Sequence, residues 1–149
     1  MFRRRIAATR RGARLARLLS TQRLAEWGVP RGSDASDTAA LIVAELAANA
    51  VVHAGAPGRA FELGLLLRAG VLRIEVTDTR ADKRPVIASA PPPDAESGRG
   101  LLLVQAVADR WGTVEGGGAR RKTVWVEVGM GAEPSSHPIA RKSGAPTPS

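Results

Sequence analysis

The chain has 149 residues, enough for one domain with a hydrophobic core of its own. It contains no cysteine, which excludes disulfides and thiolate metal sites. No apolar run approaches the ~20 residues of a membrane span, and the basic N-terminal stretch lacks the apolar segment of a secretion signal. We therefore expect a soluble, cytoplasmic protein that does not enter a membrane.

The formal net charge of +8 is typical of proteins that bind nucleic acid or another anionic partner. The basic residues gather in the N-terminal stretch, in "GARRK" and in the C-terminal tail. Aromatic residues make up only 3% of the chain, so exposed bases would find few rings on which to stack. Direct nucleic-acid binding is therefore the weaker interpretation of the charge, and a solvated basic arm is the simpler one.

Residues 1–12 are predicted to form a flexible basic arm that folding does not require. A helical pattern follows over residues 13–28 and stops at Gly28. A second helix should begin at an N-cap between Asp34 and Asp37 and end at about His53. The expected apolar stripe of the first helix consists of Leu15, Leu18, Leu19, Leu24 and Trp27.

The stretches "FELGLLL" and "VLRIEVTD" predict two strands joined by a short loop that contains Gly70. The segment 79–98 holds four prolines and few large apolar residues, so it predicts a long loop. A glycine-opened helix, "GRGLLLVQAVADRWG", and two closing strands, "TVEG" and "KTVWVEV", follow it. This order predicts an α+β fold over residues 13–131, with helices on one face of a mainly antiparallel sheet. Residues 132–149 have the composition of a disordered tail.

The stretch "ELAANAVVHAG" places Glu45, Asn49 and His53 four residues apart, so their side chains line up on one face of the second helix. Asparagine favours helix caps over helix interiors, so Asn49 carries a small local cost that a function would explain. A solvated polar stripe is the alternative, because amphipathic helices routinely have a polar face.

Two further features bear on ligand binding. Asp78 ends an apolar strand, where its carboxylate could accept a hydrogen bond from an amino group such as that of adenine; a turn-initiating Asp is the plainer explanation. In "SGRGLLL", Gly98 and Gly100 permit close backbone approach to a ligand, and the N-terminus of the helix that follows suits phosphate groups. Glycines also make ordinary turns, so neither feature decides the function alone.

Together, these motifs resemble the GHKL ATPase superfamily and, within it, the small anti-sigma-factor-like ATP-binding proteins of actinobacteria. "ELAANAVVHAG" resembles the Asn-containing box of that superfamily, "IEVTD" the start of its first glycine box and "GRGLLLVQAVADRWG" its second. "KTVWVEV" is similar to its closing strand, so the resemblance covers about residues 13–128. It implies a Bergerat-type two-layer α/β sandwich that holds ATP between its helices and a mobile lid.

The resemblance also implies roles for individual residues. Asn49 would bind the Mg²⁺ that bridges the phosphates of ATP, and Glu45 would be the general base. Asp78 would bind the adenine amino group, Thr123 would contact adenine through a water, and residues 83–97 would form the lid. The implied ATP site also includes His53 and the phosphate-closing residues Gly98, Arg99, Gly100 and Leu101.

One departure bears on catalysis. The first glycine box of the superfamily usually reads Asp-x-Gly-x-Gly, whereas this chain has "DTRADKR", with Arg80 and Asp82 in the glycine positions. Bulky charged residues there put nucleotide affinity and catalysis in question.

Two functions therefore stay open. The first is a serine/threonine kinase of the anti-sigma type, which transfers the γ-phosphoryl of ATP to a serine of an anti-anti-sigma-like (STAS-type) partner and could also bind a sigma factor. The second is a nucleotide-responsive regulator without phosphotransfer.

A basic nucleic-acid-binding protein is the third alternative. The sequence leaves open the partner, the signal and the oligomeric state, a homodimer included.

Overall fold

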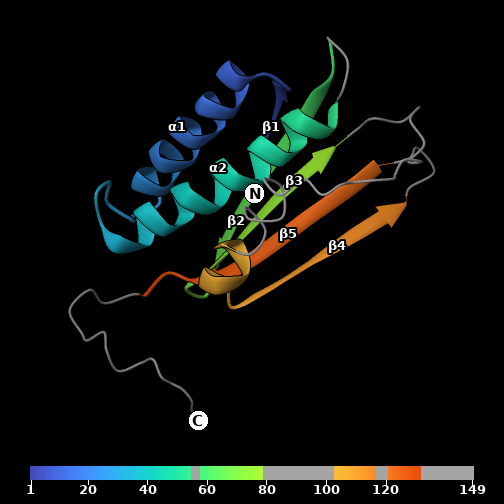
Figure 1. Ribbon diagram of the computed structural model, residues 1–149. Coiled ribbons are helices and arrows are strands. Elements are labelled where there is room, and N and C mark those ends of the chain that lie inside the picture. Colours follow the sequence, from blue (N-terminus) through green and yellow to red (C-terminus); the bar gives the residue numbers. More distant parts are fainter. Residues whose placement is uncertain (55–57, 79–102, 117–120, 132–149) are drawn as a thin grey trace.

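The computed structural model describes residues 1–54, 58–78, 103–116 and 121–131. These residues form two layers, with helices on one face of a sheet (Figure 1). The elements are β1 (Phe2–Ala7), α1 (Arg10–Glu26), α2 (Asp34–Ala54), β2 (Ala60–Arg68), β3 (Val71–Asp78), β4 (Arg110–Gly116) and β5 (Arg121–Gly129).

The described strands form one five-stranded sheet in the order β1-β2-β3-β5-β4, and every neighbouring pair is antiparallel. The predicted α+β fold is therefore confirmed. The hairpin β2–β3 turns at Ala69 and Gly70, which both have positive φ values, of 52° and 78°. The strands predicted at 113–116 and 122–128 are also present, as parts of β4 and β5.

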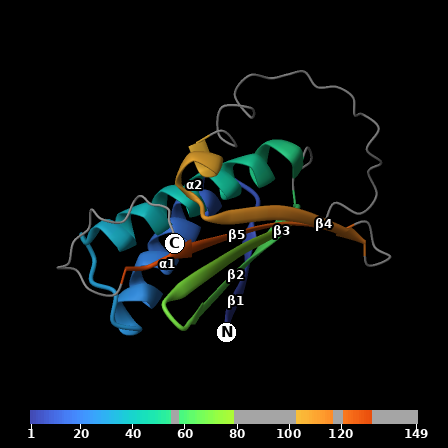
Figure 2. The same ribbon diagram turned by 90° about the horizontal axis from the view of Figure 1, so that it is seen from below.

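The hydrophobic core lies between the helices and the covered face of the sheet. On β3, Leu72, Ile74 and Val76 alternate with polar residues and are buried, as a strand with one covered face requires. From α2, Ile42 and Val43 reach the same core and are fully buried. Figure 2 shows the layers from below, with the helical segment 103–107 beside α2.

The N-terminal residues are part of the sheet, so the prediction of a flexible arm over residues 1–12 is wrong. Phe2–Ala7 pair along the whole of β1 with β2, and Ile6 is 3% exposed beneath α1. Thr9 then caps α1, because its hydroxyl oxygen accepts a hydrogen bond from the Gly12 amide at 2.9 Å. The pattern was misleading because backbone bonds hold this edge strand, and they require little apolar alternation of the side chains.

The expected apolar stripe of α1 is also partly wrong. Leu24 is fully buried, but Leu15 and Leu18 are exposed, by 43% and 58%. The buried stripe instead runs through small residues at four-residue spacing, namely Gly12, Ala16 and Ser20, before it reaches Leu24. Small side chains let α1 approach β1 closely, since a Cβ on Gly12 would collide with the carbonyl oxygen of Ala7.

The helix predicted over residues 98–112 is shorter than expected at its C-terminal end. Its described part covers residues 103–107, and Arg110, Trp111 and Gly112 belong to β4. Gly112 faces Trp125 of β5, and a Cβ there would lie only 2.9 Å from the indole ring. Gly112 is therefore part of a strand, where the absence of a side chain leaves room for the Trp125 ring, and it does not end a helix.

Among the described helices, α2 alone is long and apolar enough to span a membrane by length and composition. Its apolar side chains serve the core, since Ile42, Val43 and Leu46 are at most 2% exposed. The apolarity of α2 is thus that of a core helix.

Candidate functional site

Glu45, Asn49 and His53 all lie within α2, so their four-residue spacing places them on one side of that helix. Glu45 and Asn49 lie one turn apart within α2, and both are half-buried. They border the buried stripe that includes Ile42, Leu46 and Ala50. His53 continues the row in the last described turn of α2, where it is exposed. The stripe is therefore not simply a solvated face at Glu45 and Asn49.

Asp78 lies at the same end of the two layers. It is the last residue of β3 and is half-buried. The C-terminal part of α2, the end of β3 and the beginning of β5 meet at this end of the sheet (Figure 1). The helical layer covers the sheet less completely toward this end. Val126 of β5 is buried, whereas Val124, two residues nearer the end, is only half-buried. Glu45 and Asn49 thus lie on α2 and Asp78 on β3, two elements that pack against each other.

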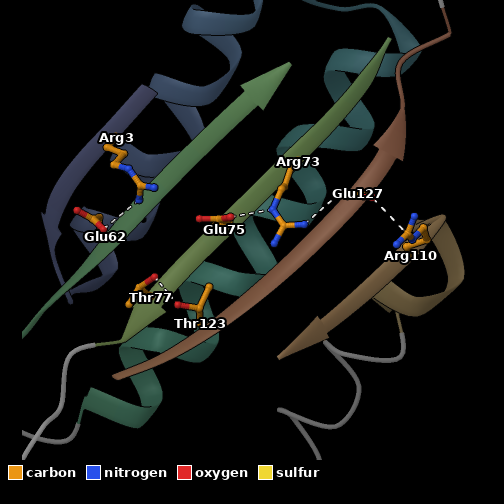
Figure 3. A network of polar contacts seen from close by, with 8 residues as sticks. All are labelled: Arg3, Glu62, Arg73, Glu75, Thr77, Arg110, Thr123 and Glu127. Atoms are coloured by element: carbon orange, nitrogen blue, oxygen red, sulfur yellow. Dashed lines mark hydrogen bonds and ion pairs between the residues drawn. The ribbon is translucent and has the colours of Figure 1, made fainter. Parts of the chain in front are cut away.

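Thr123 lies on the other face of the sheet. Its hydroxyl is 2.8 Å from that of Thr77, at hydrogen-bond distance, and Figure 3 shows this pair on the same side as Arg73 and Glu75. Strand alternation is the reason, since Thr123 is the register partner of Thr77, whereas Asp78 is the partner of Lys122. The predicted contact of Thr123 with adenine through a water stays a prediction, and the register places Thr123 on the face of the sheet opposite that of Asp78.

Lys122 is the residue that the sequence reasoning missed. It is the register partner of Asp78. Residues directly opposite each other on paired strands lie on the same face of the sheet, so Lys122 shares the face of Asp78. The two-residue period of "KTVWVEV" carries the signal: counted back from the buried Val126 through Val124, it reaches Lys122 and not Thr123. The exposed Lys122 thus belongs to the Asp78 end of the sheet.

Several predicted site residues lie outside the described part of the chain, and the structure does not test them. They are the phosphate-closing residues Gly98, Arg99, Gly100 and Leu101, the predicted lid 83–97, and the altered glycine positions Arg80 and Asp82.

No group of three His, Asp or Glu side chains suited to a metal ion occurs in residues 1–54, 58–78, 103–116 and 121–131. Mg²⁺ keeps several waters and is commonly bound through one or two protein oxygens together with substrate phosphates. The half-buried amide of Asn49 and carboxylate of Glu45 offer such oxygens one helical turn apart. The donor set therefore fits a metal that a nucleotide brings with it.

On the opposite face of the sheet, charged side chains of neighbouring strands form ion pairs (Figure 3). The Arg73 guanidinium donates to Glu75 at 2.7 Å and to Glu127 at 3.0 Å, and it stacks 4.5 Å from the centre of the Trp125 ring. Burial acts to lower the pKa of Arg73, but the bonds to Glu75 and Glu127 outweigh it and raise that pKa above its ordinary value. Arg73 therefore stays charged at any working pH, and this network is structural.

The comparison with known protein families agrees with the geometry. Residues 6–127 match the family described as "Histidine kinase-like ATPase domain", from Ile6 in β1 to Glu127 in β5. No curated protein matches the chain. Because the match covers most of its length, the chain belongs to the histidine kinase-like ATPase family. Domains of this family bind ATP, usually with Mg²⁺.

Proposed function

We propose that this ATPase-family domain is a regulatory protein kinase of the anti-sigma type. It would transfer the γ-phosphoryl group of ATP to a serine on an anti-anti-sigma-like, STAS-type protein, and it could also bind a sigma factor. Asp78 would accept a hydrogen bond from the adenine amino group, and Asn49 would supply the protein oxygen for Mg²⁺. The glycine-rich stretch 98–101 would close over the phosphates, as the sequence motif suggests.

One observation carries this proposal. Glu45 and Asn49 are both half-buried on one flank of α2, a helix that packs against β3, which ends at Asp78. A carboxylate and an amide that only met solvent would be expected on the exposed side of the helix, with Leu41 and Val52. A bound nucleotide with its metal would supply partners to polar groups that are partly withdrawn from water.

The chemistry assigned to Glu45 is general-base catalysis. The serine hydroxyl oxygen of the partner attacks the γ-phosphorus, the bond from that phosphorus to the bridging oxygen of ADP breaks, and the carboxylate of Glu45 accepts the hydroxyl proton. The products are phosphoserine and ADP. Asn49 would hold Mg²⁺ together with the phosphates, and the metal would supply positive charge that offsets theirs.

A regulator that binds nucleotide without phosphotransfer is the second candidate. The observation that favours it is the altered first glycine box, in which Arg80 and Asp82 replace the two glycines that usually allow close backbone approach. Under this reading, Glu45 and Asn49 still hold the nucleotide, and the partner responds to whether the site is filled.

Replacing Glu45 separates the two candidates. The variant Glu45→Gln keeps the shape of the side chain, so we expect near wild-type affinity for ATP but phosphotransfer slowed by about 10²–10⁴-fold. The measurement is transfer of labelled phosphate from ATP to a candidate STAS-type protein, with Asp37→Asn, an exposed carboxylate in the first turn of α2, as the matched control.

If Glu45→Gln transfers phosphate normally, the base assignment is wrong. If the wild-type chain transfers none while nucleotide still changes its affinity for the partner, the kinase proposal is wrong and the regulator is correct.

A further inference from the structure

The whole net charge of the protein comes from β1 and α1. Eight arginines precede Glu26, which is the first acidic residue of the chain. The rest of the sequence holds 14 basic and 14 acidic side chains and so adds no net charge to the +8 total. The eight are Arg3, Arg4, Arg5, Arg10, Arg11, Arg14, Arg17 and Arg23.

The outward side of α1 combines this charge with exposed leucines. Arg11 and Leu15 are one helical turn apart, as are Arg14 and Leu18, so the four side chains share one face of the helix. All four are exposed, Leu15 by 43% and Leu18 by 58%. We name these four residues the basic–leucine face. It lies opposite the buried stripe of α1, which runs from Gly12 to Leu24.

The arginines of this face have no counter-charge within the described structure. Arg3 pairs with Glu62 and Arg23 with Glu26, but neither Arg11 nor Arg14 forms an ion pair with a described residue. α1 is the outermost helix, on the β1 side of the domain and away from β4 and β5 (Figure 1). The basic–leucine face therefore lies on separate elements from Asp78 and Lys122, and its groups are available to a second molecule.

The combination of charge and apolar surface selects the occupant. A second copy of this chain would set one arginine cluster against another, which like-charge repulsion opposes. A nucleic acid would satisfy the arginines but would leave Leu15 and Leu18 without apolar contacts. A helix with acidic residues beside an apolar stripe satisfies both, because its carboxylates pair with Arg11 and Arg14 while its apolar side chains cover the leucines.

We propose that the basic–leucine face of α1 is the docking surface for an acidic amphipathic helix of a partner protein. This inference concerns where a partner binds, so it holds with or without phosphoryl transfer. Binding through this face should weaken as ionic strength rises, since exposed charge pairs are screened by salt.

The test selects partners by chemistry. The full chain is presented to a displayed library of 20-residue helices that share a leucine stripe and carry Glu, Lys or Ala at random in the flanking positions. We expect Glu-rich members to be enriched. The affinity of an enriched peptide, measured by fluorescence anisotropy, should fall roughly tenfold or more in Arg11→Glu with Arg14→Glu, and likewise in Leu15→Ser with Leu18→Ser.

Two matched controls separate this face from general effects. Arg31→Glu with Arg68→Glu makes the same change in net charge at exposed positions elsewhere, and Val52→Ser with Val71→Ser removes other exposed apolar side chains. Both controls should keep the wild-type affinity. The charge-reversed α1 variant should instead enrich Lys-rich members. All the substituted residues are exposed, so we expect every variant to fold, and an unchanged melting curve checks this. If one of the two α1 variants does not fold, the other alone tests the proposal.

Three results would overturn the proposal. The first is a library in which no member binds or Lys-rich members are enriched by the wild-type chain. The second is an equal loss of affinity in the controls. The third is tight binding of a DNA duplex or of phosphatidylglycerol vesicles that Leu15→Ser with Leu18→Ser leaves unchanged, while no peptide binds. None of these measurements includes nucleotide, so their failure is distinct from failure of the proposed function.

Discussion

The two long helices lie side by side on one face of the sheet, yet they distribute polar and apolar side chains in opposite ways. α2 buries branched residues such as Ile42 and Val43 and half-buries Glu45 and Asn49. α1 buries small residues and turns Leu15 and Leu18 outward. In each helix the informative residues are those in the unexpected environment. The half-buried polar groups of α2 support the proposed nucleotide site, and the exposed leucines of α1 support the proposed docking surface.

The largest expected effect tests whether β1 is part of the folded domain. Deletion of residues 1–7 removes the edge strand and uncovers Phe61 of β2, the register partner of the buried Ile6. Loss of a buried Ile side chain alone costs about 2–5 kcal/mol, a large fraction of the ~5–15 kcal/mol that stabilises an ordinary domain. We expect a large fall in the melting temperature, measured by circular dichroism.

The control for this deletion is removal of residues 132–149, which lie outside the described part of the chain and have a Pro-, Ser- and Ala-rich composition. That truncation should melt close to the full chain. Equal melting of both truncations would mean that β1 contributes nothing, and that the N-terminal residues do behave as an arm.

The next effect tests the orientation of α1. Leu24 is fully buried and Leu18 is 58% exposed, although both belong to the stripe that the sequence pattern predicts. Leu24→Ala should lower the free energy of unfolding by about 2–5 kcal/mol, whereas Leu18→Ala should change it by less than about 0.5 kcal/mol. Urea denaturation measures both. Similar losses in the two variants would mean that α1 is rotated from the orientation described here.

A smaller effect tests how closely α1 approaches β1. In an exposed helix interior, Gly→Ala stabilises by roughly 1 kcal/mol through backbone entropy. At Gly12 the added Cβ would collide with the Ala7 carbonyl and lie 3.0 Å from a methyl of Ile6, so Gly12→Ala should destabilise by about 1–3 kcal/mol instead. Arg17→Ala, at an exposed position of the same helix, is the control and should be nearly neutral. A more stable Gly12→Ala variant would contradict the close contact.

The sequence predicts most of the fold because the decisive signals are local. The alternation of Leu72, Ile74 and Val76 and the turn at Gly70 define the central hairpin, and the long apolar pattern defines α2. β1 escaped prediction because only Ile6 is deeply buried on that edge strand. The orientation of α1 escaped because the leucine pattern is stronger than the small-residue stripe, and only packing shows which of the two faces the core.

The sequence predicts the relative positions of site residues that lie on one helix. It does not predict those that depend on the register between two strands. Helical spacing is enough to place Glu45 beside Asn49. Placing Thr123 requires the register between β3 and β5, which pairs it with Thr77 and pairs Lys122 with Asp78. Strand alternation then moves Thr123 to the other face, a result that the motif alone could not provide.

The central claim is that the end of α2 and the end of β3 form a nucleotide site. The direct measurement is the melting temperature of the full chain with and without Mg-ATP, for the wild type and for Asn49→Ala. At ~100 times its Kd, the nucleotide should add roughly 2.7 kcal/mol of stability to the wild type. Asn49→Ala should melt normally without ligand and lose most of the shift, while the Asp37→Asn control keeps it. An unchanged melting temperature of the wild type at millimolar Mg-ATP, or an equal shift in Asn49→Ala, would contradict the claim.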